Sequence, residues 1–275
     1  MNLWVITVNF GDPNKSTKVL IDSLSLCNKA DLIKVGIADN SSTHESSNQL
    51  KEIKNQKKLD IKIFQNEKNL YYWPAAKKVL HKLKNINNSY PDWLMICNND
   101  ITFTDSDLLN KLIKINKKKY PIIGPDIISS SGKKINPFLI DSPSFLKNLY
   151  WKIYYSSYVL SIFLSIINKL WKKFFIRLDG KKEEKMKQVY AVHGAAIFFS
   201  SYFFERGGWL DDNFELFGEE MTVAKIAQTL DIPITYFPEI KILHHEHTNT
   251  KNIDRKTIYK KGKKSFQYLQ TAFNK

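Results

Sequence analysis

The chain has 275 residues, of which 43% are hydrophobic and 25% charged, proportions that are ordinary for a folded globular protein. Its two cysteines, Cys27 and Cys97, lie far apart and form no CxxC pair, which argues against a disulfide scaffold and favours a reducing cytoplasm. The formal net charge of +15 leaves two classes of anionic partner open, nucleic acid and lipid headgroups.

The N-terminal part of the chain alternates between short apolar runs and segments with helical spacing. It begins with an apolar run and lacks the basic region and long apolar region of a secretory signal. Strands are predicted at 3–10, 35–38, 61–64 and 93–97, and helices at 16–27 and 74–83. This alternation predicts an open α/β sheet whose site lies at the carboxyl edge of the strands.

Polar residues stand at the ends of three of these strands. Asn9 ends the first, and Asp39 ends the second, where a carboxylate can accept hydrogen bonds from a nucleotide base or ribose. Taken alone, Asp39 is more typical of an Asx turn or a helix N-cap. Asn98, Asn99 and Asp100 follow the fourth strand, and Asp100 offers the oxygen ligand that Mg²⁺ or Mn²⁺ requires beside a diphosphate.

Residues 144–178 differ in character, because Trp, Tyr and Lys are interspersed with aliphatic residues. The apolar core of this segment is too short and too interrupted to span a bilayer, which takes about 20 apolar residues. Two interpretations stand: an interfacial helix that lies on an anionic membrane, or a core helix pair with a solvated basic face. The basic run at 181–185 is predicted to be a loop.

The C-terminal third carries small residues and then acidic ones. Gly194 and Ala195 lead into another buried strand, and small side chains let a ligand approach the backbone closely. Glu219 and Glu220 open a predicted helix. They either complement the helix dipole or, functionally, one of them takes the proton from an acceptor hydroxyl.

A histidine-rich cluster, His244, His245, Glu246 and His247, follows the apolar run at 238–243. Such a cluster suggests contact with a metal or a phosphate, and a surface loop is the alternative. Its spacing differs from the HExxH pattern of zinc-binding helices.

In this order the segments resemble the inverting glycosyltransferases of family 2, which have the GT-A fold, from Leu3 to about Thr250. Residues 5–10 resemble the family's opening strand, residues 38–42 its "VDNxS" motif, and residues 98–100 the "NND" form of its metal-binding motif. Residues 209–220 resemble "GxFDExFFxYxED", with Glu220 in place of the usual Asp and Thr222 where many members have an acidic residue. The Gly-rich donor segment is replaced by residues 69–77, which are bulky.

The resemblance implies a role for each of these residues. Rhamnosyltransferase-like enzymes of bacterial surface-polysaccharide assembly are the nearest type. The implied catalytic residues are Glu220 and Glu219; the donor or nucleotide residues are Asn9, Asp39, Asn69, Asn98 and Asn99; the acceptor residues are Gly194, Ala195, Trp209, Asp211 and Asp212; and the metal ligands are Asp100 and His244.

The expected fold class is therefore α/β, a GT-A fold with a Rossmann-like nucleotide-binding sheet, a C-terminal acceptor-side region and an inserted helical segment. We expect a nucleotide-sugar-binding half at 1–140, a helical insertion at 141–186, an acceptor and catalytic half at 187–250 and a basic helix at 251–275.

The resemblance also implies the partners. We expect a UDP- or dTDP-sugar donor, an oligosaccharide or lipid-linked acceptor, and a divalent cation, Mg²⁺ or Mn²⁺. We expect a cytoplasmic protein that can lie peripherally on the anionic inner face of the cell membrane. The alternative is a nucleic-acid or anionic-surface binding protein driven by charge. Nucleic acid is not expected, because the lysines are spread through every segment and no nucleic-acid motif is present.

Overall fold

A computed structural model describes residues 1–175, 185–246 and 254–273. The predicted loop at 181–185, apart from its last residue, and His247 lie outside the described residues. The strands are β1 (Leu3–Asn9), β2 (Ile33–Asp39), β3 (Asp60–Gln65), β4 (Trp93–Cys97), β5 (Ile101–Phe103), β6 (Ile122–Ser129), β7 (Lys187–Val189), β8 (Ala196–Ser200) and β9 (Ile234–His244). The helices are α1 (Thr17–Ser25), α2 (His44–Asn55), α3 (Tyr72–Asn87), α4 (Leu108–Lys114), α5 (Phe145–Ser156), α6 (Tyr158–Phe175), α7 (Ser201–Glu205), α8 (Glu219–Thr229) and α9 (Arg255–Ala272), with a 3₁₀ turn η1 (Ala30–Leu32).

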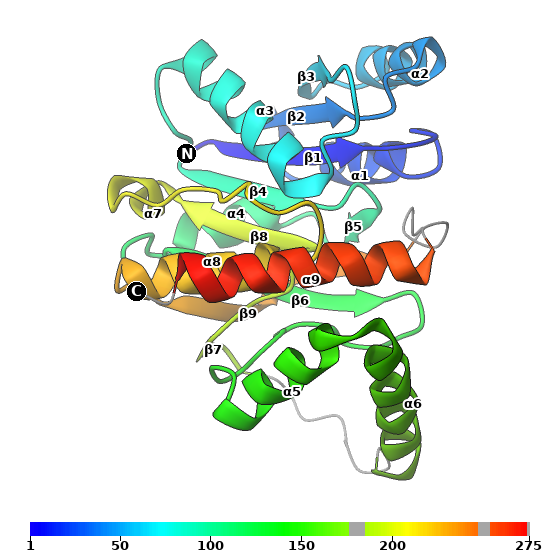
Figure 1. Cartoon of the computed structure of the whole chain (residues 1–275). Coiled ribbons are helices and arrows are strands. Elements are labelled where there is room, and N and C mark those ends of the chain that lie inside the picture. The colour runs from blue at the N-terminus through cyan, green and yellow to red at the C-terminus, as the bar shows by residue number, and fades with distance from the viewer. Residues whose placement is uncertain (176–184, 247–253, 274–275) are drawn as a thin grey trace.

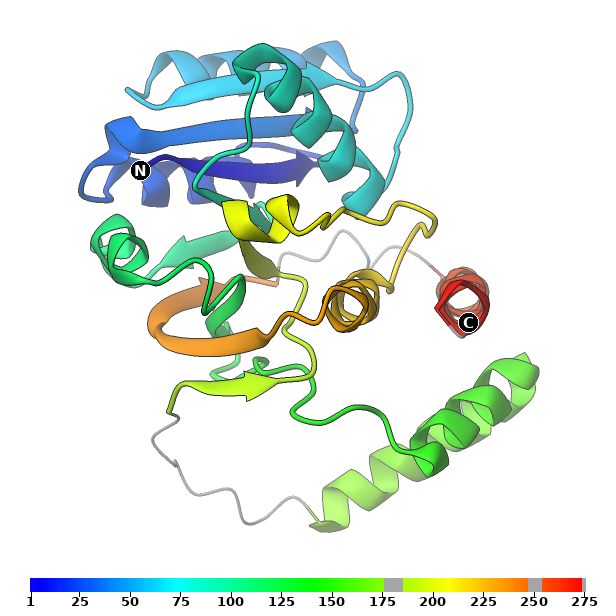
Figure 2. The same cartoon turned by 90° about the vertical axis from the view of Figure 1, so that its left-hand side faces the viewer.

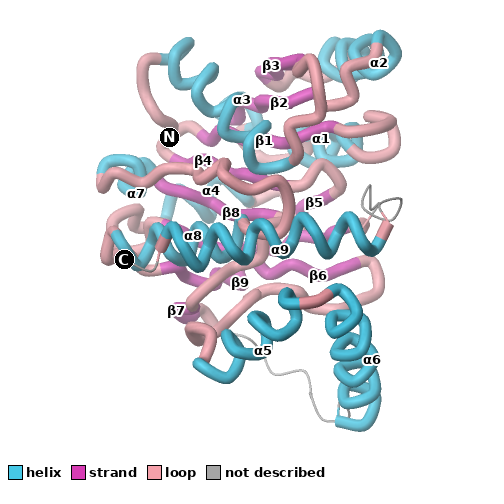
Figure 3. Tube along the Cα trace, viewed as in Figure 1, coloured by secondary structure: helices cyan, strands magenta, loops and turns pink. Residues whose placement is uncertain are grey.

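The strands form one mixed sheet in the order β3-β2-β1-β4-β8-β6-β9-β5, with β7 on β9 (Figures 1 and 3). The first four strands are mutually parallel. β8 is antiparallel to both β4 and β6, whereas β6 and β9 are parallel. The chain therefore builds a parallel half with helical crossovers and joins it to a mixed half through β8.

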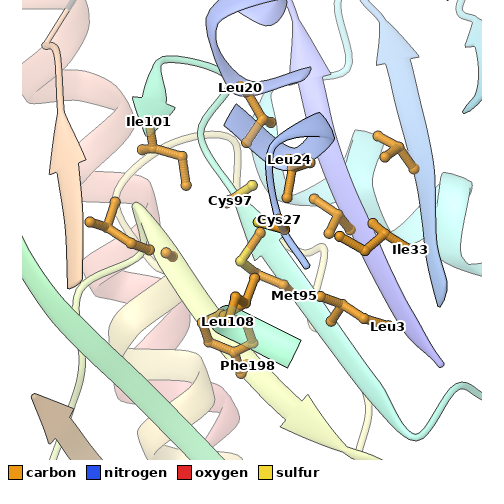
Figure 4. Close-up of a cluster of buried hydrophobic side chains, with 14 of the residues drawn as sticks. Leu3, Leu20, Leu24, Cys27, Ile33, Met95, Cys97, Ile101, Leu108 and Phe198 are labelled. Carbon is orange, nitrogen blue, oxygen red and sulfur yellow. The ribbon is translucent and has the colours of Figure 1, made fainter. Parts of the chain in front are cut away.

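Helices cover both faces of the sheet, and each face has its own apolar core. One core packs α1, α2 and α4 against the strands, and Figure 4 shows Leu20 and Leu24 of α1 facing Met95 and Cys97 of β4. The other core packs α3, α7 and α8 against the opposite face. Because both faces are covered, strands such as β1 are nearly continuous runs of apolar, branched residues.

The predicted elements correspond to real ones, with shifted ends. α3 begins two residues before Pro74, so that proline lies in the first turn, where its missing N–H removes no helical hydrogen bond. Cys27 and Cys97 are both buried and unpaired. The expected α/β fold with an inserted helical segment is confirmed.

The inserted segment forms the hairpin of α5 and α6, which projects from the sheet (Figure 2). α5 contacts α9, which crosses the outer side of α8 in Figure 1. The contact is aromatic: Tyr155 stacks on Phe266 with ring centroids 5.1 Å apart, and the hydroxyl of Tyr259 donates to the carbonyl of Tyr155. Gly262 leaves room for this contact, since a Cβ there would lie 2.8 Å from the Tyr155 hydroxyl.

Among the described residues, no helix combines the length and the apolar character needed to cross a bilayer.

Candidate active site

The sheet brings most of the predicted site residues to one edge. Asn9 and Asp39 are register partners at the carboxyl ends of β1 and β2. β4 lies beside β1 and is followed directly by residues 98–100. Because β8 runs the opposite way, its start lies at the same edge, where the Asn98 N–H donates to the Ala195 carbonyl at 2.9 Å.

Asn9 and Asp39 form a closed, fully buried network. The Asn9 amide donates to Asp39 Oδ1 at 3.2 Å and to the Ser46 hydroxyl at 3.1 Å, and it accepts from Thr17 at 2.7 Å. Asp39 Oδ1 also accepts from Ser46 and from the backbone N–H of Ser41. Asp39 Oδ2, in contrast, is buried and has no hydrogen-bond partner among the described residues. One oxygen thus holds the fold, and the other is left available for a ligand.

A cavity of about 310 Å³ opens beside this network, between the end of β1 and the start of α2. Phe10, Gly11 and Asp12 line one side, and Glu45, Ser46 and Gln49 line the other. The Phe10 ring is 43% exposed, so an apolar face and several polar groups border the same space. This combination suits a planar, hydrogen-bonding ligand.

Asn69 lies in a loop that amide side chains hold in place. Asn69 Oδ1 accepts from the Tyr71 N–H at 2.7 Å and from Asn40 at 3.1 Å, and Asn40 in turn accepts from Asn66 at 2.8 Å. Tyr71 adopts a φ of 62°, a conformation that is uncommon for a residue other than glycine. Asn69 itself is exposed, so the structure places it at the surface of this loop.

Asp100 and His244 meet at the junction of β5 and β9. His244 Nε2 lies 3.1 Å from Asp100 Oδ1 and 3.1 Å from the Asn98 amide nitrogen. Both side chains are nearly buried. Asn99 points elsewhere: its amide donates to the hydroxyls of Ser16 and Thr17 at 2.8 and 3.0 Å and fixes the start of α1.

This pair fits a small divalent cation as part of its ligand set. Two ligand atoms bound at right angles, each about 2.1 Å from one ion, lie about 3 Å apart, close to the separation seen here. Among the described residues no third histidine, cysteine or carboxylate completes a metal-binding group. Asp100 and His244 would therefore hold the ion together with oxygens from outside the protein, such as those of a diphosphate.

Glu219 and Glu220 begin α8 and pack against Gly194. Glu220 Oε1 accepts the Gly194 N–H at 3.0 Å, and Glu219 Oε2 accepts the Gly218 N–H at 2.9 Å. A Cβ at position 194 would lie 2.5 Å from Glu219 Cγ, so only glycine fits there without a shift. The small residue predicted to admit a ligand thus also admits the two carboxylates.

The two carboxyl groups have raised pKa values. Burial and then the charge of Glu220 raise the pKa of Glu219 to about 7. Burial raises the pKa of Glu220 as well, while the hydrogen bond from Gly194 opposes that rise. Because the two carboxyl groups repel each other when both are charged, they titrate as a coupled pair whose pKa values are raised.

Tyr72 joins the two sides of the site and was not predicted. Its hydroxyl donates to the Gly194 carbonyl at 3.0 Å. Its pKa lies well above the ordinary value, because of burial first and then because of nearby ionisable groups, which include Glu219, Glu220 and Asp100. The Tyr72 hydroxyl therefore lies between the carboxylate pair and Asp100. The sequence held no signal for this role, since Tyr71 and Tyr72 are adjacent and alike.

His193 is a second residue that the prediction missed. Its Nδ1 accepts the Ala195 N–H at 3.0 Å, and burial, followed by the charge of His244, lowers its pKa to about 4. The ring is therefore neutral at neutral pH, with its proton on Nε2. Its place directly before the predicted Gly194 was the available signal.

The predicted acceptor residues 209–212 are divided among different contacts. Trp209 is 40% exposed. Asp211 is buried and accepts from the Tyr268 hydroxyl of α9 at 2.6 Å, whereas Asp212 pairs with Lys77 of α3 at 2.6 Å. The structure therefore places Asp211 in the anchoring of α9 and leaves Trp209 open to solvent.

The chain is similar to known proteins in structure but not in sequence. No protein-family model matches the chain, and no curated protein matches it. The crystal structure of TarS from S. aureus is 11% identical, with a TM-score of 0.56 over 89% of this chain and 37% of that chain. GalNAc-T7, solved with UDP, GalNAc and Mn²⁺, is 12% identical, with a TM-score of 0.58 over 89% of this chain and 44% of that one. The chain thus spans less than half of either protein.

A third solved structure matches over more of its own length. The mannosyltransferase PcManGT from Pyrobaculum calidifontis, solved with GDP-Man and Mn²⁺, is 10% identical, with a TM-score of 0.52 over 98% of this chain and 70% of that chain. These neighbours are GT-A glycosyltransferases, and the mixed α/β sheet of this chain matches their fold. The chain has the GT-A fold.

Proposed function

We propose that this protein is a glycosyltransferase that moves a sugar from a nucleotide-sugar donor to an acceptor hydroxyl. One observation carries the proposal: the paired carboxylates of Glu219 and Glu220, with raised pKa values, lie at the same sheet edge as Asp100 and His244. A carboxylate base with a raised pKa near a cation-binding pair is what this chemistry requires.

The donor half is residues 1–140. Asp39 Oδ2, which has no hydrogen-bond partner in the described part of the chain, accepts from the base or ribose, and Asn9 holds that carboxylate in place. The cavity beside Phe10 takes the nucleoside, and Asn98 and Asn69 lie toward the diphosphate and the sugar. Asn99 contributes indirectly, by fixing α1.

The acceptor half is residues 187–250. Glu220 takes the proton from the acceptor hydroxyl, whose oxygen forms a bond to the anomeric carbon. The bond between that carbon and the phosphate oxygen breaks, and the nucleoside diphosphate leaves with the electron pair. Glu219 raises the basicity of the pair, and Gly194, Ala195 and Trp209 border the space for the acceptor. A divalent cation, when bound, neutralises charge on the diphosphate.

The finer assignment follows the resemblance: an inverting, family 2 enzyme that uses a UDP- or dTDP-linked hexose or deoxyhexose. TarS has been solved with UDP-GlcNAc, which supports a uridine nucleotide as the first donor to test. We propose an oligosaccharide or lipid-linked acceptor at the inner face of the cell membrane, in the assembly of a capsule, O-antigen or similar polysaccharide.

The first experiment is thermal unfolding with UDP- and dTDP-sugars, GDP-mannose and an oligonucleotide, each with and without Mn²⁺. A metal-dependent rise in the melting temperature with a nucleotide sugar is expected. A rise with the oligonucleotide alone would favour the charge-driven nucleic-acid binder and contradict the proposal.

The second experiment is turnover of the identified donor by Glu220→Gln. Loss of the general base lowers kcat about 10²–10⁴-fold, while the thermal shift with the donor persists. Glu205→Gln, an exposed glutamate at the end of α7, is the matched control and keeps wild-type turnover. Unchanged turnover in Glu220→Gln would remove Glu220 from the mechanism.

A further inference from the structure

The hairpin of α5 and α6 exposes an apolar stripe along each helix. On α5 the stripe consists of Phe145, Leu146, Leu149 and Ile153, with exposed fractions of 79%, 74%, 41% and 43%. Their spacing places them on one side of the helix. No residue of α5 is fully buried, although its other side carries the aromatic contact with α9.

α6 carries a second apolar stripe. Val159, Leu160, Phe163 and Ile166 are 72%, 41%, 60% and 51% exposed, again at helical spacing. Large apolar side chains are seldom gathered on the surface of a monomeric soluble protein, and such a patch marks an interaction site. The remaining question is which partner covers it.

The charges on these helices identify the partner. Residues 144–175 include five lysines and no acidic residue, and α9 carries one arginine and five lysines, also without an acidic residue. Lys147 and Lys152 are exposed on α5 itself, beside the apolar stripe. A second copy of the chain would bring like charges together, whereas an anionic bilayer complements them.

Aromatic residues complete the pattern. Tyr150, Trp151 and Tyr154 are half-buried and pack on one another in edge-to-face and tilted contacts. Trp and Tyr with Lys on one helix and aliphatic residues on its exposed side are characteristic of a helix that lies in the headgroup region. Neither helix crosses the bilayer, in agreement with the absence of a spanning candidate among the described residues.

We infer that the exposed faces of α5 and α6 form a docking surface for an anionic lipid bilayer. In Figure 1 the carboxyl ends of β1 and β2 point to the same side of the molecule as α6. Docking therefore holds the active-site edge near the lipid surface. This docking surface specifies how the protein would bind the membrane proposed above. Only the purpose of docking, which is to bring the active site to its acceptor, rests on the proposed function, because lipid binding itself requires no sugar transfer.

The test is flotation of the full chain with vesicles of phosphatidylglycerol and phosphatidylcholine, without donor or acceptor. The wild type binds these vesicles and binds pure phosphatidylcholine much more weakly. The double variant Phe145→Ser with Leu146→Ser weakens binding about tenfold or more, because it removes two apolar side chains from the interface. Leu26→Ser, at a position 76% exposed at the end of α1, is the matched control and binds like the wild type.

A second pair of variants tests the electrostatic contribution of the lysines to lipid binding. The double variant Lys147→Gln with Lys152→Gln is expected to bind the anionic vesicles about tenfold more weakly. The control is Lys51→Gln with Lys54→Gln, which makes the same change of charge at exposed positions of α2 and should bind like the wild type. Circular dichroism of each variant verifies folding.

Three outcomes would overturn the inference. They are absence of wild-type binding to anionic vesicles, equal binding by the Phe145 and Leu146 double variant, or a lipid-free dimer that this variant abolishes. Because nucleotide-sugar turnover is measured separately, loss of lipid binding with turnover intact rejects only the docking surface.

Discussion

The two halves of the sheet treat buried polar groups in opposite ways. In the parallel half, Asn9, Thr17 and Ser46 surround Asp39 with neutral donors, and Asn99 ties β4 to α1. In the mixed half, the site instead gathers ionisable side chains. Their pKa values are displaced toward the neutral form: upward for Glu219 and Glu220, downward for His193.

This difference assigns the stability of the site to one half of the sheet and its reactive groups to the other. Neutral amides and hydroxyls with complete hydrogen bonding stabilise the frame of the site. Carboxylates held away from water, next to one another, destabilise their charged forms and thereby become effective bases near neutral pH. Under the proposed function, the parallel half positions ligands and the mixed half supplies the chemistry. Three substitutions test this division by their effects on stability.

The largest effect is expected from Asp39→Ala in the parallel half. It leaves the Asn9 amide, the Ser46 hydroxyl and the Ser41 N–H without their acceptor and lowers the free energy of unfolding by about 4 kcal/mol. Urea denaturation measures the loss. Asp60→Ala, at a 44% exposed carboxylate in the same half, is the control and changes stability by less than about 1 kcal/mol. Equal losses in both variants would contradict the division.

Glu219→Gln in the mixed half is expected to stabilise the protein, and only above a certain pH. The unfolded chain loses the Glu219 proton near pH 4.5, whereas the folded chain retains it up to about 7. Wild-type stability therefore falls as pH rises between these values, by on the order of 3 kcal/mol for this group. The glutamine keeps an acceptor for the Gly218 N–H but has no proton to lose.

Thermal unfolding of Glu219→Gln against wild type across the pH range measures this effect. The variant and wild type should melt together near pH 4, and the variant should melt higher at pH 8. A variant that is less stable than wild type at pH 8 would show that Glu219 contributes to stability in its charged form.

The smallest effect concerns the link between the two halves through α9. Lys261 contacts the Glu215 carboxylate and lies 4.0 Å from the centre of the Tyr71 ring. Burial alone would lower the pKa of Lys261, but Glu215 and Tyr71 raise it above its ordinary value. Since the Glu215 side chain is 42% exposed, Lys261→Met should cost only about 1 kcal/mol.

Lys260→Met is the matched control, because it makes the same change at an exposed position one residue away on the same helix. Differential scanning calorimetry should separate the two variants by a few degrees at most. If both melt like the wild type, Lys261 does not stabilise the attachment of α9.

Sequence reasoning was sufficient where the position of a residue depends on local order along the chain. Asp39 and Asp100 follow apolar strands, and parallel strands bring such residues to one edge by geometry alone. It was insufficient where a role depends on packing between distant segments. Tyr72 lies at the site because the first residue of α3 reaches Gly194, just before β8, and Asp211 lies against Tyr268 because α9 folds back over α8. Neither contact has a signature in residue spacing.

The same distinction applies to α5 and α6. Composition indicated an aromatic, basic helical segment, but two interpretations were equally compatible with it. The exposed fractions of Phe145 and Leu146 favour the lipid-facing one, since a core helix would have buried them.

The antiparallel pairing of β4 with β8 also constrains how the molecule is assembled during synthesis. Cys97 pairs with Ala196, so one side of β4 remains an open edge until much of the chain has left the ribosome. Contacts between such distant segments form slowly, and an apolar strand with unpaired N–H and C=O groups is a template for misassociation. The strand that precedes Asp100 is therefore a segment that needs protection in the nascent chain.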